Sequence, residues 1–318
     1  MRRTLLITCL AALGLPAGRA DAHPPWGIAL DDKGRVVFAD IDHGNHVWRI
    51  DAPGKLSSLV SGQHSHDLYL GHDGTLFVSH IKYIPRGDRY ESRLLKIGPD
   101  GATAEVIPPT VDRKRFWGNA FTLDGGGNVY FGYTNNPRAG EVKYESLLLR
   151  RAPDGRVTAL AGGKAGHSDG KGQEAQFKAI NALAWGPDGV LYVADEAAIR
   201  RVSRDGTVTT LARDLVAERP GRSPAGSANH LFGLAVAADG TAYAADHGGR
   251  RIVKVTPDGR SATASGSESG WAPTGVAVSG DDLYILEVGA GRPGQPTGPR
   301  VLKVTPGGRS EVLATVVD

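Results

Sequence analysis

The sequence predicts an all-β fold, a six-bladed β-propeller of four-stranded antiparallel blades. Short runs of β-forming residues alternate with Asp-Gly and Gly-Gly turns, too closely spaced for helices to intervene. This group of four strands recurs six times, as expected for one repeated supersecondary unit. Closing six such sheets into a ring covers their faces and protects their edges. A β-helix, the alternative repeat fold, lacks regular hairpin turns of this kind.

The fourth repeat, residues 162–212, shows the pattern most clearly. Its strands are expected at residues 182–185, 190–194, 199–202 and 208–211, separated by Pro-Asp-Gly and Arg-Asp-Gly turns. In chain order, the six blades are expected at residues 26–60, 66–107, 119–160, 162–212, 230–264 and 274–316. The first blade opens with its inner strand and the last ends with its outer strand. Few residues are therefore left to exchange strands across the ring junction.

Residues 1–22 have the features of a secretory signal peptide. Arg2 and Arg3 precede an apolar run at residues 5–15, and Ala20-Asp21-Ala22 fits a small-x-small cleavage site. We expect cleavage after Ala22, export to the periplasm or the exterior, and a mature chain, residues 23–318, forming a single propeller domain. An uncleaved anchor is the alternative. No apolar stretch is long enough to span a bilayer, so no membrane insertion is expected after cleavage.

Composition narrows the class of partner. The leader holds three Arg and one Asp, so its removal lowers the formal net charge from +3 to +1. A charge so close to zero argues against nucleic acid or an anionic membrane as the main partner. The leader also holds the only Cys and the only Met, so the mature chain has no disulfide and no cysteine nucleophile.

The predicted insertions all lie on one face of the ring. Within each blade the strands are named A to D from the axis outward; the A–B and C–D connections are uniformly tight. The long connections are the B–C loops at residues 82–91, 134–145 and 288–299 and the D–A loops at 108–118, 162–180 and 213–229. Long loops on a rigid scaffold commonly carry binding and catalysis. We therefore expect the functional site on the D–A face.

Residues 161–212 resemble an NHL repeat. The resemblance rests on Gly166, Asp169-Gly170, Ala175, Phe177, residues 192–195 and Ile199-Arg200. It implies a six-bladed propeller of the NHL type. It implies little about activity, because such propellers include both enzymes and binding scaffolds.

The opening of the mature chain is similar to that of the regucalcin/gluconolactonase family. His23-Pro-Pro-Trp-Gly is followed by a Gly turn and by a strand that ends in Asp40-Ile41. Members of that family bind a divalent cation in the central channel through Glu and Asn/Asp side chains at the starts of inner strands. Asn119 and Asn181 fall where the two Asn ligands would lie. His23 or Pro24 replaces the Glu, and Phe232 or His230 replaces the Asp.

The first residues of the six inner strands should form a ring at the channel mouth. They are Trp26 or His23, His66, Asn119, Asn181, His230 and Thr274. Together with the resemblance, this convergence predicts one divalent metal ion bound by His66, Asn119, Asn181, His230 and His23. Imidazole and amide donors suit zinc, copper or iron better than calcium. The alternative is that each residue only caps a loop carbonyl.

The ends of the B strands supply the candidate catalytic groups. Glu287 precedes a long Gly/Pro-rich loop, and His80 stands where other blades carry an acid. Both are predicted to carry protons in catalysis. Asp40, Asp195 and Asp246, at the same position, are interpreted as acceptors for turn amides.

Two functions agree with these observations. The first is an exported enzyme, a metal-assisted, lactonase-like hydrolase or a lyase, acting on a small oxygen-rich molecule. In its repeated His and NHL spacing the chain is also similar to the peptidyl-hydroxyglycine amidating lyase, a six-bladed NHL propeller with a His-bound metal, and this similarity favours a His site. The second is a non-catalytic scaffold whose long loops bind a protein or glycan. Ser168 lies in a Gly-x-Ser-x-Gly string but lacks the strand–turn–helix context of a nucleophile.

Overall fold

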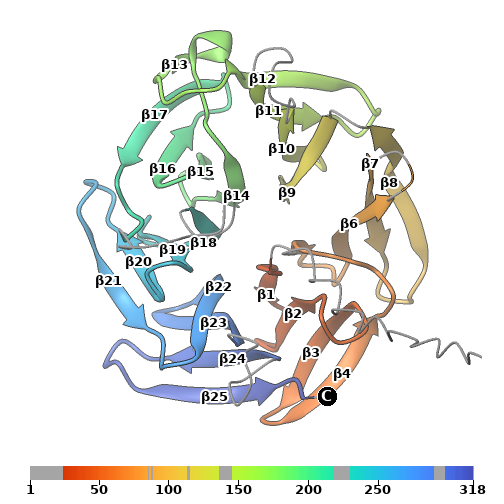
Figure 1. Ribbon diagram of the computed structural model, residues 1–318, viewed down its shortest axis with the longest axis vertical. Coiled ribbons are helices and arrows are strands. Elements are labelled where there is room, and N and C mark those ends of the chain that lie inside the picture. Colours follow the sequence, from red (N-terminus) through yellow and green to blue (C-terminus); the bar gives the residue numbers. More distant parts are fainter. Residues whose placement is uncertain are drawn as a thin grey trace, which may run out of the picture.

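The computed structural model is a ring of six antiparallel sheets (Figure 1), which confirms the predicted six-bladed β-propeller. It describes residues 24–84, 86, 89–112, 115–135, 145–217, 230–289 and 298–317. Of residues 82–83, 89–90, 110–112, 115–119 and 134–135 it describes the backbone only. Among the described residues, no helix has the length and apolar character needed to cross a membrane.

The first three blades follow one another around the ring, each with strands A to D in chain order. Blade one comprises β1 (Ile28–Leu30), β2 (Val36–Asp40), β3 (His46–Ala52) and β4 (Lys55–Val60). Blade two comprises β5 (Leu68–Leu70), β6 (Leu76–Ile84), β7 (Arg89–Ile97) and β8 (Thr103–Asp112). Blade three comprises β9 (Arg115–Leu123), β10 (Val129–Asn135), β11 (Glu145–Arg151) and β12 (Val157–Lys164).

The last three blades repeat this order, and blade four adds a strand. Blade four comprises β14 (Ile180–Trp185), β15 (Leu191–Asp195), β16 (Ala198–Val202) and β17 (Thr207–Ala212). Blade five comprises β18 (Leu231–Val236), β19 (Ala242–Asp246), β20 (Arg251–Val255) and β21 (Ser261–Gly266). Blade six comprises β22 (Trp271–Ser279), β23 (Asp282–Gly289), β24 (Pro299–Val304) and β25 (Ser310–Thr315).

Turn chemistry explains why the chain reverses where it does. In blade four Gly189 has a φ of 71°, a left-handed conformation that favours glycine. The preceding Asp188 accepts the amide of Val190 at 3.1 Å, closing the turn between β14 and β15. Asp73 and Asp239 accept the amides of Thr75 and Thr241 in the same way. This local chemistry fixes the A–B hairpins on the face opposite the long loops.

Two of the predicted loops are instead continued strands. β6 and β7 pair as far as Ile84 with Arg89, so most of the predicted loop at residues 82–91 is an extended hairpin. β8 and β9 likewise reach Asp112 and Arg115 across the predicted loop at 108–118. Because their neighbours β7 and β10 extend equally far, pairing continues where the local sequence indicated a loop. The predicted loops at 134–145, 213–229 and 288–299 lie largely outside the described residues.

The ring is closed without strand exchange, since every blade takes its four main strands from consecutive residues. The junction between blades one and six is instead an apolar interface, in which Phe38 and Ile50 pack against Leu286, Val301 and Val316. One backbone hydrogen bond, from the amide of Gly54 to the carbonyl of Leu313, spans it at 2.7 Å. Apolar burial therefore holds the ring together at this junction.

Candidate functional site

The strand registers identify which residues form the mouth of the central channel. Phe38 of β2 pairs with Ile28, and the corresponding B-strand residues pair with Leu68, Phe121, Leu183, Leu234 and Val276. In each blade, the residue two positions before this paired inner-strand residue belongs to a set that we call the mouth ring. The mouth ring consists of Trp26, His66, Asn119, Asn181, Phe232 and Thr274. Five of the six predicted positions are thus placed as expected.

Blade five differs from the prediction at this ring. Leu234 pairs with Ala244, so the equivalent position two residues earlier is held by Phe232 and not by His230. His230 lies two residues earlier, and its ring packs on Phe232 with centroids 4.4 Å apart. His230 therefore borders the mouth ring without being part of it.

Histidine and aromatic side chains gather at the mouth. The indole of Trp26 lies 5.5 Å from the ring of His66 and 6.0 Å from that of Phe232, between centroids. His64 meets His66 edge-on at 4.9 Å, and His247 meets Phe232 at 5.3 Å. Trp26, His66 and Phe232 are buried. The mouth therefore combines apolar walls with imidazole groups, a common composition for a small-molecule site.

Hydrogen bonds set the orientation of His64 and of His80. The amide of His64 donates to Nδ1 of His80 at 3.2 Å, so a neutral His80 carries its proton on Nε2. Nδ1 of His64 lies 2.8 Å from Oδ1 of Asn45 and donates to it, which leaves Nε2 as the basic nitrogen. Burial lowers the pKa of His64 below its ordinary value of 6.5, against the opposing charge of Asp42. His64 is therefore neutral at pH 7 and can accept a proton.

The predicted metal ligands are only partly described. His23 and the side chain of Asn119 lie outside the described residues. The amide nitrogen of Asn181 is buried and has no hydrogen-bond partner among the described groups. Within this part of the chain no three His, Cys, Asp or Glu side chains are grouped so as to hold a metal ion. The metal site predicted with two Asn ligands stays a prediction.

The acids that end the B strands are engaged in structural contacts. Asp40 accepts the amides of Asp42 and His43, and Asp246 accepts that of Gly249, which confirms their interpretation as turn acceptors. Asp195 instead accepts two amides of the D–A loop, those of Lys178 and Ala179, at 2.7 and 2.8 Å.

Glu287, predicted to carry a proton, occupies the same position in blade six. Its carboxylate is buried and accepts a hydrogen bond from Nε of Arg300 at 2.8 Å. The Arg300 guanidinium also lies over the ring of Trp271, 4.1 Å from its centroid. These contacts favour a structural role for Glu287, analogous to that of the aspartates.

Sequence reasoning missed one acid in the channel, Asp67, the residue after His66. It is buried, and its two carboxyl oxygens accept the amides of Leu68 at 2.9 Å and of Phe121 at 3.3 Å. Burial raises the pKa of Asp67 to about 7, against the opposing effect of these amides and of the Trp26 side chain. The available signal was an acid within an inner strand where other blades carry Gly or Ala.

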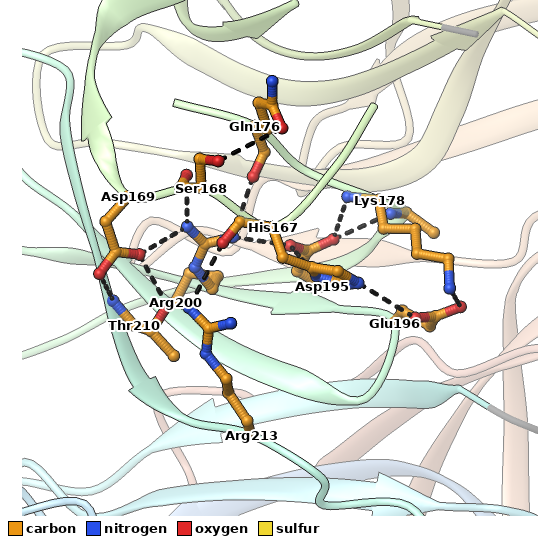
Figure 2. A network of polar contacts seen from close by, with 11 residues as sticks. His167, Ser168, Asp169, Gln176, Lys178, Asp195, Glu196, Arg200, Thr210 and Arg213 are labelled. Atoms are coloured by element: carbon orange, nitrogen blue, oxygen red, sulfur yellow. Dashed lines mark hydrogen bonds and ion pairs between the residues drawn. The ribbon is translucent and has the colours of Figure 1, made fainter. Parts of the chain in front are cut away.

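A network around Arg200 fixes the D–A loop between β12 and β14, residues 165–179 (Figure 2). The Arg200 guanidinium is buried and donates to the carboxylates of Asp195 at 2.9 Å and Asp169 at 2.8 Å. It also donates to the carbonyls of Ser168 and Gln176, both at 3.0 Å. A short strand in the loop, β13 (Gly170–Lys171), pairs with β17. Ser168 thus belongs to a loop scaffold, as the sequence context indicated.

Comparisons with known proteins establish the fold. No family model matches the chain, and no curated protein matches it. A gluconolactonase from Xanthomonas campestris shares 16% identity over 83% of each chain, with a TM-score of 0.54. A streptogramin B lyase shares 14% identity over 93% of this chain and 84% of its own, with a TM-score of 0.55.

A third structure is a virginiamycin B lyase from Staphylococcus aureus, solved with quinupristin as a catalytically inactive histidine-to-alanine variant. It shares 18% identity over 92% of this chain and 84% of its own, with a TM-score of 0.51. Together these structures confirm the resemblance to gluconolactonase-like propellers at the level of the fold. At such identities they do not establish activity.

We expect Arg200→Met to destabilise the protein by about 3–5 kcal/mol, because it leaves the buried Asp195 without its counter-ion. Urea unfolding of the purified protein measures the change. The neighbouring Arg201→Met is the control, since Arg201 pairs with the partly exposed Asp188 at 2.7 Å and should cost less than about 1 kcal/mol. Equal losses in the two variants would contradict the assignment.

The raised pKa of Asp67 predicts a pH-dependent stability. The folded state keeps this proton up to about pH 7, whereas the unfolded chain releases it near 3.8. The proton therefore stabilises the fold at low pH, and this contribution is lost as pH rises toward 7. As the pH rises from 5 to 8, the free energy of unfolding of Asp67→Asn should therefore increase by roughly 2–3 kcal/mol relative to that of the native protein. Urea titrations at both pH values test this, and a constant difference would refute it.

Proposed function

We propose that the protein is an enzyme that hydrolyses a small lactone or related cyclic ester at the channel mouth. The observation that carries the proposal is the grouping of His64, His66 and His80 beside the apolar walls formed by Trp26 and Phe232. Imidazole groups near neutral pKa are the usual acid–base catalysts of such reactions. The similarity in fold to a gluconolactonase and to a virginiamycin B lyase is compatible with it.

The polar residues at the mouth can take different roles in this reaction. Nε2 of His64 takes a proton from water as the water oxygen forms a bond to the carbonyl carbon and the carbonyl π electrons move to oxygen. When the carbonyl re-forms, the ring C–O bond breaks and the His64 proton passes to the departing oxygen, giving a hydroxy acid. The unpartnered amide nitrogen of Asn181 can donate a hydrogen bond to the carbonyl oxygen as its charge grows. His66 and His80 position the substrate and His64.

A divalent metal ion is a separate proposal. His66 and Asn181 would contribute to its coordination, together with His23, Asn119 or His230, and a bound cation would polarise the carbonyl. No step above depends on this ion. Metal analysis of the purified protein decides between hydrolysis with a bound metal ion and hydrolysis without one.

His64→Ala should lower kcat/KM for a lactone substrate by about 10²- to 10⁴-fold, because the general base is lost. The assay uses a panel of aldonolactones and aryl esters, followed by acid release. In the native enzyme, the acid limb of the pH profile should lie below the ordinary histidine value of 6.5, since burial lowers the pKa of His64.

The matched control is His72→Ala, since His72 is exposed in the turn between β5 and β6, away from the mouth. It should keep native activity. A product heavier than the substrate by one water indicates hydrolysis, whereas a product of unchanged mass indicates a lyase. No turnover of the panel by the native protein would contradict the proposal and favour a scaffold that binds a protein or glycan.

We also propose that the protein is exported, from the leader-like residues 1–22. Expression of the full chain in a bacterial host should give a mature protein that begins at His23. Intact-mass spectrometry and N-terminal sequencing of the periplasmic fraction measure this. Recovery of the full-length chain in the cytoplasm would refute export, and Ala22→Arg, which disrupts the cleavage site, is the control.

A further inference from the structure

A cavity of about 400 Å³ occupies the central channel beneath the mouth ring. All six inner strands contribute to its lining, and the aromatic side chains around it are Trp26, Tyr69, Phe121 and Trp185. Asp67 is the only acidic or basic side chain among the described residues that line it. The volume lies in the range of sites for small organic molecules. This cavity is distinct from the histidine cluster on which the proposed hydrolysis rests.

The blade architecture does not require an acid where Asp67 lies. The equivalent residues of the other blades are Gly27, Ala120, Ala182, Gly233 and Gly275, which with Asp67 we call the second tier. Neighbouring inner strands approach closely here: a Cβ added to Gly27 would lie 2.7 Å from the amide nitrogen of Leu68. At Gly233 it would lie 2.8 Å from Cα of Gly275. Five blades therefore meet the constraint with the smallest residues, and only blade two carries a charge-bearing side chain.

Asp67 also differs from three of the other buried acids in having no arginine counter-ion. Asp195, Asp246 and Glu287 each pair with an arginine, at 2.9, 2.9 and 2.8 Å. Asp67 accepts two backbone amides, but no described arginine, lysine or histidine forms an ion pair with it. A carboxylate in such a setting is costly to ionise unless a cation joins it. Its missing partner is the feature that points to a ligand.

We propose that the channel cavity binds a small organic cation, such as a protonated primary amine, with Asp67 as its counter-ion. The positive group would lie against the Asp67 carboxylate and the surrounding aromatic faces, which attract cations through their quadrupoles. The apolar remainder of the ligand would fill the space between the inner strands. This site is independent of the proposed hydrolysis and can hold whether or not the histidines catalyse it.

The test compares benzylamine with its neutral isostere benzyl alcohol on the mature protein at pH 8. Binding is followed by isothermal titration calorimetry and by the fluorescence of Trp26 and Trp185. We expect benzylamine to bind at least about tenfold more tightly than the alcohol, since a desolvated ion pair and cation–π contacts favour the amine. Asp67→Asn should abolish this difference. Asp73→Asn, an exposed acid of the same blade, should leave it unchanged.

A second measurement keeps the proposal testable if Asp67→Asn folds poorly. In the native protein, phenylacetate, an anion of similar shape, should bind more weakly than benzyl alcohol, because it brings a second carboxylate beside Asp67. Equal affinity for amine and alcohol, or tighter binding of phenylacetate than of the alcohol, would overturn the assignment.

Discussion

The close approach of the inner strands is the constraint on which the rest of the molecule depends. Six sheets can share one axis only if their innermost strands nearly touch, and the second tier shows how little room remains there. Glycine and alanine fill that tier in five blades because a larger side chain would meet the neighbouring backbone. Asp67 is accommodated because its carboxylate accepts the amide of Phe121 from the next blade. A polar link thus replaces close packing at this one point.

The blades are similar to one another away from the axis and differ most in the side chains that they place near it. Away from the axis, the blades use the same devices several times: Asp-Gly hairpins, an acid at the end of strand B, and an arginine that neutralises it. Arg200, Arg251 and Arg300 are examples of the last device. At the mouth ring the six positions hold five different residue types, including indole, imidazole, amide and hydroxyl groups. The chemistry of the protein is concentrated where the repeat is least regular.

The sequence was sufficient to predict the fold because turn chemistry and strand alternation are local. Asp188-Gly189 specifies a hairpin wherever it occurs, so six similar blades could be counted. The long-range features were harder to predict. Residues 82–91 and 108–118 were predicted as loops, but pairing with neighbouring strands of equal length continues them as sheet. His230 was likewise predicted at the mouth ring, but the pairing of Leu234 with Ala244 of β19 places Phe232 there.

The candidate site shows the same limit in chemical terms. His66 and Asn181 could be predicted at the mouth because they follow D–A loops at fixed points of the repeat. His64 and Asp67 acquire their properties from burial: the same desolvation lowers the pKa of the imidazole and raises that of the carboxyl. Both shifts favour the neutral form, so the axis of the propeller is a region in which charge is suppressed. The histidine cluster and the channel carboxyl are therefore best understood as neighbours in one low-dielectric channel.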